Sequence, residues 1–129
     1  MRITADTNVL VRAIVEDDEL QSPIAQRVLS EAELVAVAIP ALCELVWVLR
    51  RAYRLTNRDV AEALRRLIGA RNVVVDRQAA EAGLAMLDAG GDFADGAIAH
   101  EGRWLGAEVF LSFDRDAVNL MPGAARSPE

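Results

Sequence analysis

Short apolar runs alternate with longer amphipathic helix patterns along the whole chain, and this alternation restricts the fold more than any other feature. The apolar runs cover residues 2–5, 34–39, 72–75 and 108–112. Helical periodicity fills the gaps at residues 22–32, 41–53, 57–70, 78–87 and 92–106. Strand and helix alternating in this way are typical of a parallel sheet covered by helices. The sequence therefore predicts a three-layer α/β/α fold, with a central parallel β-sheet of four or five strands.

One domain is expected to account for residues 1–129, with a frayed C-terminal tail from about residue 122 to 129. Hydrophobic residues make up 53% of the chain, which is enough to build an apolar core. No apolar run approaches the roughly 18 to 20 residues that span a bilayer, and the N-terminus lacks the apolar segment of a secretory signal. We therefore expect a cytoplasmic protein with no membrane association.

The composition removes several kinds of chemistry. All 14 basic residues are arginine, so the chain has no lysine for a Walker A loop or for Schiff-base catalysis. His100 is the only histidine, which excludes mechanisms with two imidazoles, and we expect it at the surface or behind a site. Cys43 is the only cysteine, which excludes an intramolecular disulfide, and its apolar surroundings predict a buried thiol. Carboxylates remain as the abundant reactive groups.

Acidic residues follow the predicted strands at several points. Asp6 comes directly after the first apolar run, Glu44 lies in the opening turns of the helix after the second, and Asp114 follows the last. The helix that begins near Asp92 and Asp95 leads into that last strand, so its start should face the same edge. Ligands of open parallel sheets bind at the carboxyl ends of the strands. Four segments are therefore expected to bring acids to one rim.

Each aspartate also has a purely structural interpretation. Asp6 fits the N-cap of the helix that follows it, and Asp92 with Asp95 fits a cap with an acid in the first turn. Asp114 and Asp116 fit a turn or the start of a short helix. Both interpretations stay open for these residues.

Glu44 is harder to explain without a partner. Its neighbours in the sequence are apolar, and an unpaired carboxylate within such a helix would carry a large desolvation cost. Arg51 could pair with it, but a cation held by several carboxylates would explain all four acidic segments together. Mg²⁺ and Mn²⁺ prefer oxygen ligands and can activate a bound water, with one ion or two.

Four stretches, "ADTNVLVRAI", "IPALCELVWVLRR", "DFADGAIAHEG" and "LGAEVFLSFDRD", together resemble the PIN domain family, specifically its VapC-like ribonuclease toxins of type II toxin–antitoxin systems. The resemblance implies a catalytic, metal-binding set made of Asp6, Glu44, Asp95 and Asp114. It also implies auxiliary polar residues, which are Asn8, Asp92, Ser112 and Asp116. One departure is Ala117, where the family usually has an aromatic residue, and it puts the local loop geometry in question.

The resemblance further implies a Mg²⁺- or Mn²⁺-dependent endoribonuclease that cuts RNA phosphodiester bonds with metal-activated water. Its partners would be an RNA substrate and a cognate antitoxin protein, and the toxin would be a homodimer, or a heterotetramer or larger assembly with antitoxin. The formal net charge of −6 argues against broad attraction to nucleic acid, although a bound metal would make an acidic groove locally attractive to phosphate.

Three alternatives remain. A receiver-like phosphoacceptor domain and a phosphatase of the haloacid dehalogenase type also gather acids at a parallel sheet, but both normally use a lysine. A catalytically inactive PIN-like domain could serve as a binding module instead, and only metal binding or activity separates it from the toxin.

Aromatic and basic residues give weaker signals. Trp47 and Tyr53 are expected in the core, with a dimer or antitoxin surface as the alternative, and Trp104 and Phe110 are expected in the core. Six of the fourteen arginines fall within residues 50–66. They predict either a solvated helical hairpin or a surface that contacts a partner or phosphate.

Overall fold

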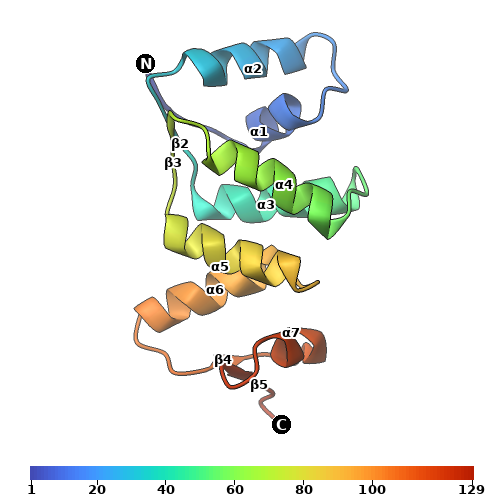
Figure 1. Ribbon diagram of the computed structural model, residues 1–129, viewed down its shortest axis with the longest axis vertical. Helices are drawn as coiled ribbons and strands as arrows, with labels where there is room; N and C mark the ends of the chain where they lie inside the picture. Colours follow the sequence, from blue (N-terminus) through green and yellow to red (C-terminus); the bar gives the residue numbers. More distant parts are fainter. The chain divides into compact units, whose positions relative to one another are not determined.

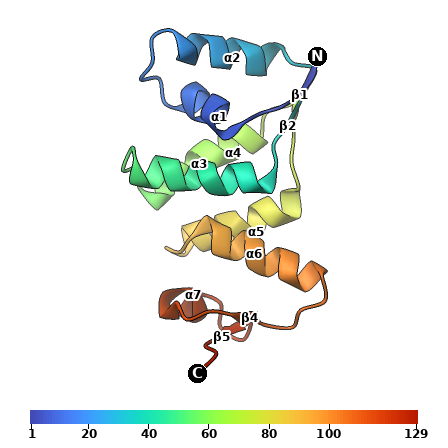
Figure 2. The same cartoon turned by 180° about the vertical axis from the view of Figure 1, so that it is seen from behind.

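The computed structural model describes all 129 residues, and the chain forms two compact units, residues 1–76 and 77–129. The first unit contains β1 (Arg2–Thr4), α1 (Thr7–Ile14), α2 (Gln21–Glu31), β2 (Leu34–Ala36), α3 (Ile39–Arg51), α4 (Asn57–Ile68) and β3 (Val73–Val74). The second contains α5 (Arg77–Asp88), α6 (Phe93–Trp104), β4 (Phe110–Leu111), α7 (Arg115–Leu120) and β5 (Ala125–Arg126). Figures 1 and 2 show these elements from opposite sides.

The first unit is built on a parallel sheet in the order β1-β2-β3. The register aligns Ile3 with Val35 and Val35 with Val73, so β2 lies in the middle. Val35 is fully buried, as expected for the central strand of a sheet covered by helices. Because the strands are parallel, β1 and β2 end at the same edge, from which the chain continues into α1 and α3.

The helices of this unit pack against one another through apolar stripes. α3 packs against both α1 and α4, and α2 packs against α1 (Figures 1 and 2). The fully buried residues of this unit include Leu10, Leu42, Leu45, Leu49, Val60 and Leu64. Their spacing of three or four residues within each helix is the pattern that predicted these helices.

The second unit centres on the pair α5 and α6, which pack side by side after a short turn (Figure 1). Two glycines permit the close approach. A Cβ atom on Gly83 of α5 would overlap the ring of the fully buried Phe93, and one on Gly96 of α6 would overlap the backbone carbonyl oxygen of Ala82. Glycine is therefore required at both positions despite its low helix propensity.

The expected α/β class is confirmed, but the strands are grouped differently from the single sheet of four or five that we predicted. β4 pairs in parallel with β5, and the backbone N–H groups of Phe110 and Ser112 donate to the carbonyls of Ala124 and Arg126. The ladder groups of β4 are thus satisfied by the C-terminal segment. β5, formed by Ala125 and Arg126, lies within the tail for which we expected fraying.

The predicted helix positions are confirmed to within a few residues. Of two residues typical of an N-cap near these helix starts, Thr56 caps α4, whereas Ser22 does not cap α2. Thr56 caps α4 by accepting from the N–H of Asp59 at 3.1 Å. At α2, Asp18 accepts from the N–H groups of Leu20 and Gln21, and the buried hydroxyl of Ser22 donates to the carbonyl of Val15 instead. None of the helices has both the length and the apolar character that crossing a membrane would require.

Candidate metal centre

Asp6 stands at the end of β1, where the chain turns into α1. Its Oδ1 accepts from the backbone N–H of Thr7 at 2.8 Å, and its Oδ2 accepts from the side-chain amide of Asn8 at 3.3 Å. Asp6 is therefore the N-cap of α1, as one interpretation of the sequence predicted. The carboxylate is also exposed, so capping does not remove it from contact with a ligand.

Glu44 lies in the second turn of α3, and our expectation that apolar neighbours would enclose it is wrong. Leu42, Leu45 and Leu49 form the buried stripe of the helix, whereas Glu44 is exposed on the opposite side. The apolar letters beside Glu44 in the sequence point to other faces of the helix. Burial therefore gives no reason to expect a cation at Glu44. Glu44 stays a candidate metal ligand because of its position near the edge of the sheet where Asp6 also lies.

In the second unit, Asp92 and Asp95 occupy the start of α6. Asp92 is the N-cap and accepts from the backbone N–H of Ala94 at 3.3 Å. Asp95 follows in the first turn and is half-buried, beside the glycine that lets α6 approach α5. Tight packing of the two helices thus fixes the backbone that carries Asp95.

Asp114 follows β4 and is the N-cap of α7. Its Oδ1 accepts from the N–H groups of Asp116 and Ala117 at 3.0 and 3.3 Å, and its own N–H donates to Ser112 Oγ at 3.0 Å. Ala117 is 3% exposed and takes part in this cap. The missing aromatic residue at position 117 therefore leaves the start of α7 intact.

Asp95 is electrostatically linked to the other acids of its unit. Burial raises the pKa of its carboxyl above 3.8, and repulsion from Asp92 and then from Asp114 raises the pKa further. Asp92, Asp95 and Asp114, which we call the acidic cluster, are linked by this repulsion. A group of this kind is stabilised by a cation.

Comparison with known protein families decides between the folds that gather acids in this way. The PIN domain profile matches residues 3–120, which is most of the chain and runs through both units. The chain belongs to the PIN domain family. The PIN domain is a nuclease-like fold whose members are generally metal-dependent nucleases, so the receiver-like and dehalogenase-like alternatives are set aside. No curated protein matches the chain.

The candidate residues carry the type of side chain that binds a hard divalent cation. Mg²⁺ and Mn²⁺ are bound through a few carboxylates together with water and substrate phosphate, and the candidate residues offer carboxylate oxygens. Asp6 and Glu44 come from the first unit, and Asp95 and Asp114 come from the second. Neither unit by itself gathers three or more acidic, histidine or cysteine side chains in a metal-binding arrangement.

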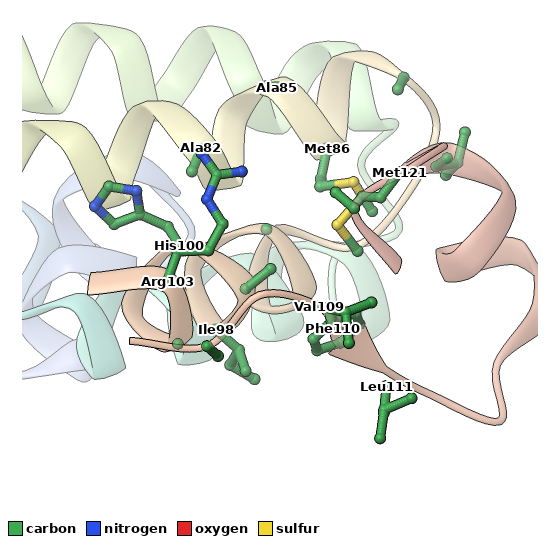
Figure 3. Close-up of a pocket in the computed structure, with 17 residues that line it drawn as sticks. Ala82, Ala85, Met86, Ile98, His100, Arg103, Val109, Phe110, Leu111 and Met121 are labelled. Carbon is green, nitrogen blue, oxygen red and sulfur yellow. The ribbon is translucent and has the colours of Figure 1, made fainter. Parts of the chain in front are cut away.

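A separate cavity of about 410 Å³ lies within the second unit of the PIN domain, and Figure 3 shows its lining. His100 and Arg103 of α6 lie at one end, and Met86 and Met121 lie at the other. The lining is mainly apolar and includes none of the candidate acids. His100 therefore faces an apolar cavity in this unit and is not part of the acidic cluster.

The exposure of the aromatic residues in this PIN domain contradicts the predicted core position for two of them and agrees with it only in part for two more. Trp47 is 60% exposed and Trp104 is 81% exposed, so neither lies in the core. Phe110 and Tyr53 are half-buried, and the Tyr53 hydroxyl donates to Asp17 at 2.9 Å. Cys43, expected to be buried, is half-buried. Helical spacing could have predicted the exposure of Trp47. This residue lies three positions after the exposed Glu44, on the same side of α3.

The acidic cluster leads us to a prediction about the titration of Asp95. We expect the Asp95 carboxyl to titrate above pH 3.8 in carboxyl-detected NMR, and Asp92→Asn to lower this pKa only in part, because burial is the larger cause. Since the folded state then binds the proton more tightly than the unfolded state, this group destabilises the fold above its folded pKa. The penalty is relieved as the pH falls through that pKa toward 3.8.

A matched variant tests the cause of the shift. Glu101→Gln removes an exposed acid farther along α6 and should leave the titration of Asp95 unchanged. An Asp95 carboxyl that titrates at or below 3.8 would contradict the described cluster.

Proposed function

We propose that this PIN domain is a Mg²⁺- or Mn²⁺-dependent endoribonuclease, with the metal held by Asp6, Glu44, Asp95 and Asp114. The observation that carries the proposal is the match of residues 3–120 to a family whose members are generally metal-dependent nucleases, in a chain that places Asp6, Asp95 and Asp114 at the starts of α1, α6 and α7. Parallel β1 and β2 support it further, because Asp6 and the helix of Glu44 both follow the carboxyl edge of that sheet.

The residues of the proposed site would have different roles. A divalent ion, when bound, supplies Lewis acidity and lowers the pKa of water, so that hydrolysis needs no covalent nucleophile. The N-cap hydrogen bonds of Asp6 and Asp114 restrict the rotation of their carboxylates and so orient them in advance. Asn8 orients Asp6, and Ser112 orients the backbone of Asp114. Asp92 and Asp116 would add negative charge around the ion.

The RNA product ends follow from in-line hydrolysis at phosphorus. Attack by water opposite the 3′-oxygen of the preceding nucleotide would leave a 5′-phosphate and a 3′-hydroxyl. An enzyme that used the ribose 2′-hydroxyl would instead leave a cyclic phosphate. The chemistry of the fragment ends therefore distinguishes the proposed reaction from contaminating ribonucleases that act through the 2′-hydroxyl.

We further propose a biological setting as the toxin of a type II toxin–antitoxin pair, acting in the cytoplasm as a homodimer and held inactive by a cognate antitoxin. The resemblance of the four sequence stretches to VapC-like toxins supports this setting. Light scattering on the purified chain and coexpression with the protein encoded beside it would test the two assemblies. A monomer that is unaffected by that neighbour would argue for a PIN nuclease outside such a pair.

Metal binding and cleavage can be measured on the same preparation. We expect Mg²⁺ or Mn²⁺ to support cutting of end-labelled structured RNA, and EDTA to stop it. Metal should also raise the melting temperature, since a ligand at a hundred times its Kd stabilises the folded state by about 2.7 kcal/mol. Ca²⁺ provides a matched control, because it prefers more oxygen ligands than Mg²⁺ and a looser geometry.

The two readouts separate the possible results. Metal stabilisation with EDTA-sensitive cutting supports the proposal. Stabilisation without cutting of any RNA class would favour an inactive, metal-binding PIN domain, and a protein that neither binds metal nor cuts would favour a binding module without metal.

A further inference from the structure

Helix α3 presents two different faces. Leu42, Leu45, Val46 and Leu49 are buried, whereas Glu44, Trp47 and Arg51 are exposed. With about 100° between successive residues, the three exposed side chains fall within an arc of about 60°. A proposed metal ligand, an aromatic ring and a guanidinium group therefore form one stripe along the helix, which we call the α3 stripe.

Trp47 is an unusual residue to find on such a surface. Its side chain is 60% exposed although tryptophan is among the largest apolar side chains. The Arg51 guanidinium carbon lies 5.6 Å from the centre of the Trp47 ring, close enough for a cation–π interaction. The guanidinium lies over one face of this exposed ring. An aromatic ring next to a positive charge matches a nucleotide, which has a base to stack and a phosphate to neutralise.

Positive charge is concentrated around the end of the α3 stripe. Arg50, Arg51, Arg54 and Arg58 are all exposed, and they extend from the last turn of α3 through the connecting turn to the start of α4. Arg51, Arg54 and Arg58 make no ion pair with a carboxylate. Arg50 donates to the carbonyl of Leu55 at 2.8 Å and so ties the turn to the helix. In a chain with a net charge of −6, this is a local basic surface.

We propose that the α3 stripe and these arginines bind single-stranded RNA, with a base stacked on Trp47 and phosphates beside Arg51, Arg54 and Arg58. This inference rests on the proposed function, because the bound strand would run along α3 toward Glu44. Three residues of helix rise about 4.5 Å, so Trp47 would hold a nucleotide next to the one at Glu44.

Charge complementarity favours RNA over a second copy of the chain at this surface. In a twofold symmetric contact the same surface meets itself, so the unpaired arginines of the two copies would be brought together. Like charges brought together in this way oppose association. The RNA backbone brings a negative charge with every nucleotide, which complements the same arginines.

Binding can be measured separately from cleavage. We would use the full chain carrying Asp95→Asn as the parent and titrate it against a fluorescent single-stranded RNA, following anisotropy. Adding Trp47→Ala should raise the Kd by about 5- to 100-fold, as expected for loss of one stacked base, and Trp47→Phe should recover part of that loss. Trp104→Ala, which removes the exposed tryptophan of the other unit, should leave the Kd unchanged.

Salt dependence tests the phosphate contacts. For single strands, each phosphate contact that is lost reduces the slope of log K against log salt by about 0.7. Arg51→Ala should produce this change, whereas Arg27→Ala, which removes an exposed arginine on α2, should not. In the protein that keeps Asp95 and cleaves RNA, Trp47→Ala should raise the KM for RNA cleavage and change kcat little.

The outcomes are distinct. RNA binding that does not depend on Trp47 or Arg51 overturns the α3 stripe as an RNA surface while leaving the nuclease proposal standing. A change of oligomeric state in Trp47→Ala with an unchanged Kd also overturns it and assigns the surface to a second copy. Binding that depends on Trp47 without cleavage by the wild type supports the surface and overturns only the nuclease proposal. A parent that binds no RNA overturns the surface, whereas cleavage by the wild type decides the nuclease proposal separately.

Discussion

Asp95→Asn is expected to lower metal-dependent RNA cleavage by roughly 10²- to 10³-fold, the largest loss we expect from any single substitution. Asparagine keeps the shape of the side chain but removes the negative charge and one anionic ligand oxygen. A loss of about 3 to 4 kcal/mol in transition-state stabilisation corresponds to this range of rates. The substitution should not unfold the protein, because it removes the repulsion that Asp92 and Asp114 exert on Asp95. Initial rates on end-labelled RNA and melting curves with EDTA would be measured in parallel.

Glu101→Gln is the matched control for this variant. It lies on the same helix, is exposed, and neutralises one acid without touching the cluster, so its cleavage rate should equal that of the wild type. Wild-type cleavage by a folded Asp95→Asn protein would remove Asp95 from the proposed metal ligands.

The second large effect concerns the fold of the unit that carries Asp95. Gly96→Val should lower the free energy of unfolding by about 3 kcal/mol, because the new side chain would overlap the backbone carbonyl oxygen of Ala82 and the side chain of Met86. The helices α5 and α6 would have to separate, since a backbone atom cannot move away alone. The melting temperature should fall by roughly 10 °C for a chain of this size.

Gly102→Val provides the comparison on the same helix. A Cβ atom at Gly102 meets only the Cβ of Ala107, at 3.8 Å, so this variant changes helix propensity and little else. We expect its stability to stay close to that of the wild type, as measured by urea unfolding. Equal losses for the two variants would mean that helix propensity rather than close packing decides the effect at Gly96.

The elements of the fold were predictable because the signals for them are local. Apolar runs at 2–5 and 34–39 contain β1 and β2, and the cap at Thr56 marks the start of α4. Pairing between distant segments was not predictable in the same way. Residues 125 and 126 carry no strand pattern of their own, and they form β5 because backbone groups of β4 bond to that segment.

The candidate acids, too, could be predicted from the sequence only in part. Their positions after strands and at helix starts followed from sequence, and Asp6, Asp92 and Asp114 do cap α1, α6 and α7. The surroundings of Glu44 and Trp47 were not predicted correctly from the sequence, because residues that are adjacent in a helical sequence lie on different faces of the helix. A stricter use of the 3.6-residue period would have placed both residues opposite Leu42 and Leu45. Trp104 shows the remaining limit, since a large apolar residue near a helix end can lie outside the core.

The three capping aspartates have a consequence for how this family can diverge. Asparagine caps a helix about as well as aspartate, so replacing Asp6, Asp92 or Asp114 by asparagine should leave the fold nearly as stable. A single-base change in a codon converts aspartate to asparagine. At Asp6 or Asp114 such a change would remove a proposed metal ligand while leaving the stability of the fold almost unchanged. The architecture therefore makes it easy for gene duplicates to lose nuclease chemistry, survive as stable scaffolds and take up new binding roles.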